Sequence, residues 1–600
     1  MGDDILQYYE RELSFIREMG GEFARKYPKI AGRLLLDNDK SDDPHVERLI
    51  EAFAFLSGRI HKKIDDNLPE ITESLFQILY PHYNSPIPSM SVAAFSPMIQ
   101  SIPPSGYHIP SDTPLFSKQI SGMQCQFRTR YPVTFWPVEV VSAALKEPRK
   151  AFSNSQQALV IQLKSSNGIS FSQLDWQSLR FFLNGQGQHV FQVYEMLFNN
   201  VSHVEFVGLN ANGTPVEILQ GGNAIESVGF SPDEAMLPPT GRSFPGHLLL
   251  SEYFCFMEKF LFFDVAGLEK LSKYSLKDSL EIWIYFDRIA KTGLLVSNEM
   301  FCLNAVPIVN LFTRPTEPIQ VDQTKTEYLV IPDIRRQDAT EVFTVDRVAS
   351  FPMSKQKEKV FRPFYSLNHH ISGNDGEHDD VFWHTRRNPS GRYGDDGTDL
   401  YISFADIDFN NVKPNAEIVM IQATCTNRDL PGKMKFGDSS GDFETEIAAP
   451  VSSIRCLLKP TMSHRLTPGG TLQWQLISNL ALNYMSIVQG GEDALKEILR
   501  IYDFDNSPAT SQQISGIVSL NSTYTTKRIG RSFCRGVQVE ITFDEEKFVG
   551  SALYLFANIL ERFIGQYVSV NSFTQLIART LQRKEVFKIW PPRSGNRVLL

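Results

Sequence analysis

The chain has 600 residues, of which 42% are hydrophobic and 21% charged, and its formal net charge is −9 with a pI near 5.8. This composition is typical of a large globular protein with three or four modules, and it excludes a chain dominated by disordered tails. The net acidity gives no long-range attraction to nucleic acid or to an anionic membrane surface, so we expect neither as a partner.

Residues 1–85 carry the pattern of three amphipathic helices. In the first helix, apolar residues recur at spacings of three and four and form one seam, which only glycine interrupts. Phe15 and Met19 lie beside this seam and widen the apolar face, so we expect more than one neighbouring element to cover it. Pro28 ends the pattern. The seam consists of Leu6, Tyr9, Leu13, Ile16, Gly20, Phe23 and Tyr27.

The second helix begins at Asp43 and Pro44, an N-cap residue followed by a proline at the first helical position. Phe53 and Ile60 belong to its apolar face. A third helix, in LPEITESLFQILYPHY, ends at Pro81. One interpretation of the three helices is a bundle that closes on its own core, and the other is a bundle completed by helices of other subunits.

These helices resemble the start of a known family. The strings YYERELSFIREMGGEFARKYPKIAGRL, DPHVERLIEAFAFLSGRI and LPEITESLFQILYPHY are similar to the N-terminal region of the TssF family, also called VasA or ImpG. The resemblance continues through LNAVPIVNLFTRPTEPI and FVGSALYLFANILERFIGQYVSVNSFTQL to the near-terminal KIWPPRSG. It covers almost the whole chain and is weakest from about Ser354 to Asp380.

The resemblance implies a non-enzymatic structural subunit in the baseplate wedge of the bacterial type VI secretion system. In such wedges two copies of the family assemble with one TssG, TssK trimers join them, and the wedges surround the VgrG hub beneath the contractile tail and its sheath. The resemblance also implies an architecture similar to wedge proteins of contractile phage baseplates, whose N-terminal helices build an inter-subunit bundle. We therefore expect a cytoplasmic location, in a baseplate docked at the inner-membrane complex. The residues expected in the bundle with TssG and the second copy are Leu6, Tyr9, Leu13, Ile16, Phe23, Phe53 and Ile60.

The middle of the chain predicts two β-rich domains, residues 86–318 and 319–450. Short runs rich in β-branched and aromatic residues alternate with proline and glycine turns in both. In the first domain, Asn184-Gly185 after LRFFL predicts a hairpin turn, and HVFQVYEMLFNN predicts one helix. In the second, the expected strands are TEYLVI, EVFTVDRV, LYISFADIDF and EIVMIQATC.

Residues 451–600 predict a small mixed α+β domain, which makes the whole chain a multidomain α+β protein. The expected elements are helices in LQWQLISNLALNYM and EDALKEILRIYDF, an alternating strand in GVQVEITFD and a closing hairpin of TQLIART with EVFKIW. The apolar run Phe548–Ile564 contains Glu561 and Arg562 and is shorter than the roughly twenty residues of a membrane-spanning helix. A buried helix, without membrane insertion, is therefore the favoured interpretation.

The N-terminal string and the cysteines point to the cytoplasm. MGDDILQYYERE has no basic region followed by an apolar run, so we expect no export signal. Six cysteines are scattered along the chain and form no CxxC pair, which favours reduced core thiols over disulfides or a zinc site.

A search for catalytic motifs returns no HExxH, Walker A or GxSxG string, so no cofactor is expected. The glycines of NGQGQ fit a hairpin better than a phosphate loop, because a phosphate site also needs a following helix. Asp395, Asp396 and Asp399 lack the spacing of a calcium loop and predict a turn before a strand.

One segment justifies a metal test, LNHHISGNDGEHDDVFWHTRR. Imidazole and carboxylate groups at such spacings can bind zinc or nickel, so the alternative function is a metal-dependent hydrolase that uses the loop from His369 to His384. An exposed polar loop is favoured, because its glycine and asparagine residues do not fix ligand geometry. The candidate ligands are His369, His370, His378, Asp379, Asp380 and His384.

Near the C-terminus, Trp590 and Arg593 stand on either side of two prolines. Aromatic residues and arginine are enriched at protein interfaces, so these two residues are candidates for a second contact with a partner. The alternative is a tail that packs on its own domain.

Overall fold

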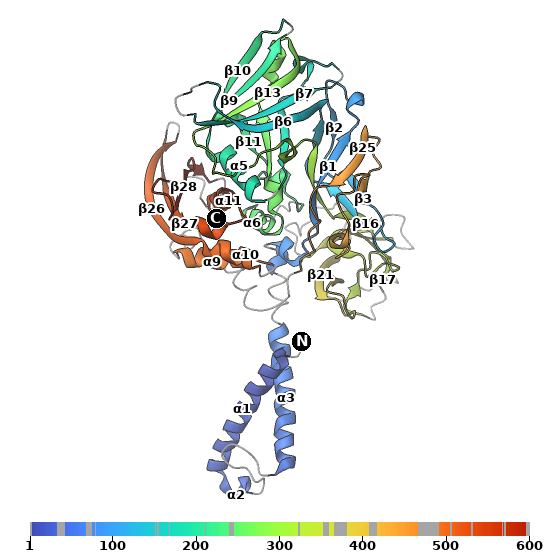
Figure 1. Ribbon diagram of the computed structural model, residues 1–600. Helices are drawn as coiled ribbons and strands as arrows, with labels where there is room; N and C mark the ends of the chain where they lie inside the picture. The colour runs from blue at the N-terminus through green and yellow to red at the C-terminus, as the bar shows by residue number, and fades with distance from the viewer. Residues whose placement is uncertain are drawn as a thin grey trace. The chain divides into compact units, whose positions relative to one another are not determined.

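The chain forms two compact units in the computed structural model, residues 1–77 with 467–478 and residues 78–466 with 479–600. Figure 1 shows the helices and strands of both units. The structure describes residues 3–32, 43–67, 75–78, 80–150, 152, 155–166, 168–185, 187–210, 212–238, 245–321, 325–351, 359–364, 381–406, 417–465, 491–504, 507–529, 532–566, 568 and 572–595.

The first unit is built from α1 (Asp3–Lys26), the short α2 (Pro28–Ala31) and α3 (Pro44–Asn67). The predicted end of the first helix and the predicted start of the second are both confirmed. α1 stops before Pro28, and the backbone N–H of His45 donates to Asp43 Oδ1 at 2.8 Å, which caps α3. Of the third predicted helix, the structure describes the helical turn at 75–78, and residues 68–74 lie outside the described part.

The second unit contains a closed barrel whose strands come from distant parts of the sequence. Neighbouring strands in it are antiparallel, and β1 pairs with both β15 and β25. The barrel strands, in spatial order, are β1 (Met90–Pro97), β15 (Ala305–Val309), β4 (Gln126–Thr129), β3 (Pro114–Ser117), β24 (Phe443–Glu444) and β25 (Val451–Cys456).

Three further groups of strands accompany the barrel. The helix predicted in HVFQVYEMLFNN is confirmed as α5 (Gly187–Asn199), and a second helix is α6 (Pro245–Cys255). One sheet has the order β10 (Pro215–Gly221), β9 (Val201–Asn210), β13 (Leu276–Phe286), β7 (Gln157–Ser165) and β6 (Val138–Lys146). The others are β11 (Ile225–Ser227), β12 (Phe262–Ala266), β8 (Ser178–Leu183) and β14 (Phe301–Cys302), and the pair β2 (Tyr107–Ile109) with β5 (Val133–Phe135).

An eight-stranded sheet forms the second β-rich region, and it has its own apolar core around Val348, Ile402 and Ile421. The four strands predicted here from sequence are confirmed as β18, β19, β22 and β23. The strands are β16 (Phe312–Pro315), β23 (Glu417–Thr426), β19 (Glu341–Phe351), β20 (Lys359–Pro363), β21 (Val381–Pro389), β22 (Thr398–Asp406) and β18 (Tyr328–Leu329), with β17 (Ile319–Val321) beside β23.

The C-terminal region is the predicted mixture of helices and strands. β27 and β28 are parallel, and α11 connects them in a β-α-β unit. The elements are α9 (Gly491–Arg500), α10 (Pro508–Ser515), β26 (Ile517–Ile529), β27 (Ser532–Phe543), α11 (Leu553–Gly565), β28 (Ser572–Thr580), β29 (Lys588–Ile589) and β30 (Arg593–Ser594). The predicted closing hairpin is confirmed as the antiparallel pair β28–β29. The helix predicted in LQWQLISNLALNYM lies outside the described residues.

α11 settles the interpretation of the apolar run near the C-terminus. Twelve of its residues are buried within the unit, including Asn558 and Glu561, so it is a core helix. In the described part of the chain, no helix combines the length and the apolar character that crossing a membrane requires.

The strand pairing corrects two of the expected domain boundaries. Residue 451 is the expected start of the C-terminal domain. The residues from 451 to 456 form β25, which pairs with β1 in the barrel, with Cys456 opposite Ala93. β16, expected within residues 86–318, pairs with β23 of the second sheet, with Phe312 opposite Cys425. The reason is that these ladders join segments more than a hundred residues apart, and local composition carries no signal for such pairing.

The hairpin predicted at Asn184-Gly185 is wrong. β8 ends at Leu183 and the chain enters α5 at Gly187, so the turn joins a strand to a helix. Gly185 has a φ of 140°, which favours glycine whichever element follows. The Asn-Gly signal therefore identified a turn but not its continuation.

A buried histidine makes the stability of the second unit depend on pH. His82 is 4% exposed and its ring stacks on Phe343, with centroids 6.4 Å apart. Burial lowers the pKa of His82 from 6.5 to about 4. Protonation therefore favours the unfolded chain, and the stabilisation is complete above pH 6.5 and is lost as the pH falls toward 4.

We expect this group to lower the free energy of unfolding by about 2 kcal/mol between pH 7 and pH 5. Urea unfolding of the protein and of His82→Leu, at both pH values, measures the effect. Between pH 7 and pH 5, the free energy of unfolding of the variant should fall by about 2 kcal/mol less than that of the wild type. Equal losses in the two proteins would contradict the assignment to His82.

Candidate functional site

The two long helices of the first unit meet through polar side chains. Ser57 donates to Glu12 Oε2 at 3.0 Å, and His61 Nδ1 lies 3.0 Å from Glu12 Oε1. Arg17 and Glu47 form an ion pair of 2.5 Å nearer the other end of the hairpin. From Glu12 to Arg17 along α1, the contacted residue of α3 moves back from Ser57 to Glu47, so the helices are antiparallel, as Figure 1 also shows.

Small residues of α3 let the two helices approach closely. Ala54 is fully buried, and a Cβ added to Gly58 would lie 3.1 Å from the backbone of Tyr8 and Tyr9. A side chain there would force the helices apart. The contact therefore includes alanine, glycine and polar groups, and many of the large apolar residues are left for other surfaces.

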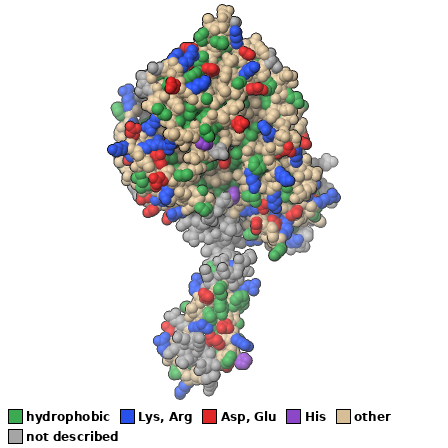
Figure 2. Space-filling model, viewed as in Figure 1, with side chains coloured by type: hydrophobic (Ala, Val, Ile, Leu, Met, Phe, Trp, Pro, Cys, Tyr) green, Lys and Arg blue, Asp and Glu red, His purple; other side chains and the backbone are tan. Residues whose placement is uncertain are grey.

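Those large apolar side chains lie on the surface of the unit. Eleven of them are between 39% and 70% exposed. Figure 2 shows hydrophobic side chains gathered on the surface of these helices, among lysine, arginine and acidic residues. An exposed apolar surface of this kind on a small helical unit marks a protein interface. The residues are Leu6, Phe15, Met19, Phe23, Tyr27, Ile30, Leu49, Phe53, Phe55, Leu56 and Ile60.

On α3, four of these residues form a continuous stripe, which we call the α3 stripe. They are Leu49, Phe53, Leu56 and Ile60, and each is more than half exposed. Their spacings of four, three and four residues place them on one side of the helix. This spacing is the one by which a helix packs against another helix, and its partner is absent from the described part of the unit.

The predicted bundle residues divide into two groups. Leu6, Phe23, Phe53 and Ile60 are exposed, whereas Tyr9, Leu13 and Ile16 are half-buried. Their membership of an inter-subunit bundle stays a prediction. The set omitted Leu49, Leu56 and Phe15, which are among the most exposed apolar residues of the unit. The signal that could have found them is the small and polar character of Glu12, Ala54 and Gly58, which marks the side of each helix that turns inward.

The two C-terminal candidates are placed within their own domain. Trp590 is 5% exposed, stacks on Tyr554 with centroids 5.8 Å apart and donates from Nε1 to Asn558 at 3.2 Å. Arg593 forms a two-pronged ion pair with Glu561, at 2.7 and 2.9 Å. This is the alternative in which the tail packs on its own domain, so a partner contact here stays a prediction limited to the half-exposed guanidinium of Arg593.

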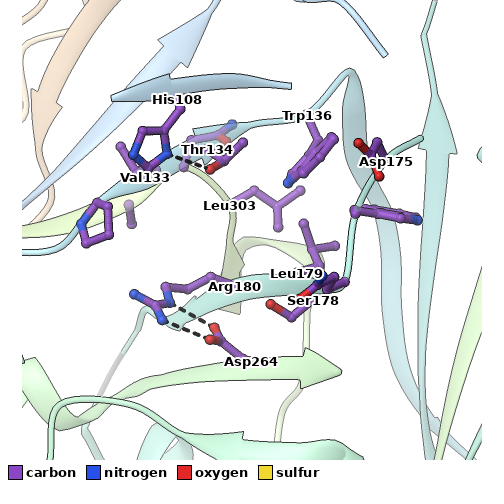
Figure 3. Close-up of a pocket in the computed structure, with 15 residues that line it drawn as sticks. His108, Val133, Thr134, Trp136, Asp175, Ser178, Leu179, Arg180, Asp264 and Leu303 are labelled. Carbon is purple, nitrogen blue, oxygen red and sulfur yellow. Dashed lines mark hydrogen bonds and ion pairs between the residues drawn. The ribbon is translucent and has the colours of Figure 1, made fainter. Parts of the chain in front are cut away.

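A cavity of about 260 Å³ lies beside the β2–β5 pair and the start of β8, and Figure 3 shows its lining. Arg180 donates two hydrogen bonds of 2.8 Å to Asp264, and His108 Nδ1 lies 3.2 Å from Thr134 Oγ1. A hydroxyl beside an imidazole is part of a nucleophilic site, but such a site also needs a group that orients the imidazole. Asp264 already accepts hydrogen bonds from Arg180, and Asp175 lies on the far side of Trp136 from His108. Neither carboxylate therefore orients the imidazole of His108. The cavity therefore offers room for a small group without a catalytic arrangement.

The other candidate chemical groups are held in structural contacts. Asp395, after the turn that precedes β22, and Asp399, on β22 itself, both pair with Arg428. The turn before the strand is the predicted one. His384 lies on β21, where burial lowers its pKa. The remaining members of the histidine cluster, residues 369–380, lie outside the described residues. Within the described residues, no three His, Cys, Asp or Glu side chains gather in a way that could hold a metal ion.

The cysteines carry no sign of redox or metal chemistry in the described part of the chain. All six are free thiols, and burial raises the pKa of Cys125, Cys425 and Cys456 to about 12. These three thiols therefore stay protonated and unreactive, as their burial predicts.

Comparison with known proteins gives one consistent family. The sequence model described as "Type VI secretion system, TssF" matches residues 1–597. The type VI secretion system component TssF1 of Pseudomonas aeruginosa PAO1 is 34% identical over 633 aligned positions, which span 100% of each chain.

Two solved structures share the fold. A chain of the type VI secretion system TssK-TssF-TssG baseplate subcomplex, solved by cryo-electron microscopy, has a TM-score of 0.74 and 25% identity, and covers 92% of this chain and 100% of its own. A chain of the type VI secretion system baseplate complex has a TM-score of 0.61 and 24% identity, and covers 99% of this chain and 100% of its own. Because the family model spans nearly every residue and a relative of the same extent is 34% identical, the chain belongs to the TssF family of the type VI secretion system.

Proposed function

We propose that this chain is a non-enzymatic structural subunit of a type VI secretion baseplate, and that the α1–α3 hairpin is the element through which it assembles. The observation that carries the proposal is the way the hairpin closes. Polar and small residues join the two helices, and eleven large apolar side chains remain at the surface. A hairpin arranged in this way is completed by helices of other subunits.

The partners follow from the family. A similar chain occurs in a solved complex with TssK and TssG, so TssG and TssK are the proposed neighbours. The proposed wedge has two copies of this chain for one TssG, TssK trimers attached to it, and contacts with the VgrG hub and the sheath. The proposed location is the cytoplasmic face of the inner membrane, in a baseplate docked on the membrane complex. The likeness to phage wedge proteins stays a prediction.

The energetics favour a hairpin that is buried on assembly. Covering a phenylalanine, leucine or isoleucine that was exposed contributes about 1.5–3 kcal/mol when burial is complete. Since Phe15, Met19 and the α3 stripe are about half exposed or more, each can still contribute a part of that. Several such residues together offset the loss of translational and rotational freedom on binding.

A cellular experiment tests the proposed function. In a strain that lacks this chain, fluorescent sheath protein should stay diffuse, and the wild-type chain should restore assembled sheaths. Leu13→Glu and Ile16→Glu should fail to restore them, because each places a carboxylate in a contact that excludes water, at a cost of several kcal/mol. Normal sheath assembly without the chain would overturn the baseplate role.

A further inference from the structure

The hairpin of β26 and β27 has one side that no described strand occupies. β27 pairs with β26 on one side and with β28 on the other. β26 pairs with β27 alone among the described strands, which makes it an edge strand of this sheet. With 13 residues, β26 is also a long strand to stand at an edge.

Residues 520–526 of this edge lack the features by which proteins usually block unwanted pairing. Natural edges are short, bulged, or carry proline or charge. In β26 the irregularity in register is confined to Ile517 and Ser519, and from Leu520 to Thr526 the strand has neither proline nor charge. Threonine and tyrosine in this stretch favour extended backbone, and residues 521–524 are all exposed.

The hairpin is basic in an acidic protein. From Asn506 to Val539 the sequence contains no Asp or Glu, whereas the whole chain has a net charge of −9. The basic residues of this stretch are Lys527, Arg528, Arg531 and Arg535. A local excess of one sign selects a partner of the opposite sign and orients it on approach.

Aromatic side chains stand beside the same edge. Tyr524 is opposite Val537, so it lies on the face of the sheet that also carries the buried Val539 and Ile541. On that face Phe543 contacts Phe556 of α11, with centroids 6.2 Å apart. Farther along, Phe533 is 78% exposed and the Arg535 guanidinium lies 5.2 Å from the Tyr524 ring. The helix-covered face thus continues into an uncovered platform of rings and cations.

We propose that β26 is a docking edge, to which an extended acidic segment of a neighbouring protein subunit adds as a further strand. The backbone groups of residues 520–526 supply the ladder hydrogen bonds. Arg528 and Arg535 pair with the acidic side chains, and Phe533 and Tyr524 pack against the apolar ones. Lys527 takes no part, because its ammonium donates to Gln575 on β28. The proposal rests on the proposed baseplate function, because the subunit that supplies this segment is expected in the complex with TssG and TssK.

Hydrogen exchange measured by mass spectrometry tests this edge. The free chain is compared with the chain in its purified complex with TssG and TssK. The amides of residues 519–526 should exchange at least tenfold more slowly in the complex. The double variant Arg528→Glu, Arg535→Glu should lose this protection, and Phe533→Ser, which removes a side chain that is mostly in solvent, should weaken it.

The helices α1 and α3 serve as the internal reference. If they are protected in the complex and β26 is not, the docking edge is wrong and the baseplate function stands. If neither is protected, the proposed function fails first. Equal protection of β26 in the concentrated lone chain, or on adding a DNA duplex or phosphatidylglycerol vesicles to it, would overturn the choice of an acidic protein segment. Unchanged exchange of β28 in the variants shows that the sheet itself is intact.

Discussion

The double variant Phe53→Glu, Ile60→Glu is expected to lose its complex with TssG while the lone chain stays folded. Phe53 is 64% exposed and Ile60 51%, so neither carboxylate would be buried in the isolated chain. In the assembled bundle, both would replace apolar contacts, each of which contributes a part of the about 1.5–3 kcal/mol of complete burial. They would also bring unpaired charges into a contact without water. A combined loss above about 4 kcal/mol weakens binding by roughly three orders of magnitude.

Co-purification with tagged TssG and size-exclusion chromatography measure this effect. Arg59→Glu is the matched control, because Arg59 is exposed on the same helix outside the α3 stripe and the substitution changes the net charge by the same amount. The control should keep the complex. If the double variant elutes with TssG as the wild type does, the α3 stripe is not the docking surface.

Glu252→Ala is expected to destabilise the second unit by about 3–5 kcal/mol. Glu252 and Lys259 form an ion pair with both side chains essentially excluded from water. The other carboxylate oxygen accepts from the backbone N–H groups of Met236 and Leu237, at 2.7 and 3.2 Å. The alanine variant therefore leaves a buried ammonium and two buried donors without this acceptor. Burial already lowers the pKa of Lys259, so the charge there is costly even with its partner.

Thermal unfolding measures this loss, and two further variants identify its cause. Glu269→Ala removes an exposed carboxylate and should change stability by less than about 0.5 kcal/mol. Glu252→Gln with Lys259→Met removes the charge and keeps an acceptor for Met236 and Leu237, so it should recover most of the loss. If the double variant is as unstable as Glu252→Ala, the unpaired charge is not the cause.

The local elements of the fold could be predicted because their signals lie within short stretches. Asp43 and Pro44 predict the start of α3, and the alternation from Val537 to Phe543 predicts β27. Phe548–Ile564 predicts a buried helix, because its apolar run is too short and too polar for a membrane. In each case the deciding residues are neighbours in the sequence.

The barrel could not be predicted, because its order depends on pairs such as Ala93 with Cys456. The same limit applies to the candidate site. The seam of α1 was visible in the sequence, but which side of it faces α3 depends on the contact of Glu12 with Ser57 and on the close approach at Gly58. Those contacts join two helices, and a periodicity within one helix cannot show them.

Assembly through the helical hairpin is tested most directly by the mass of the complex that this chain forms with TssG. The two proteins are co-expressed, purified through a tag on TssG and measured by multi-angle light scattering. The expected result is a uniform species with the mass of two copies of the 68.1 kDa chain and one TssG. A chain that remains a uniform single species and ignores TssG would contradict assembly through the helical hairpin.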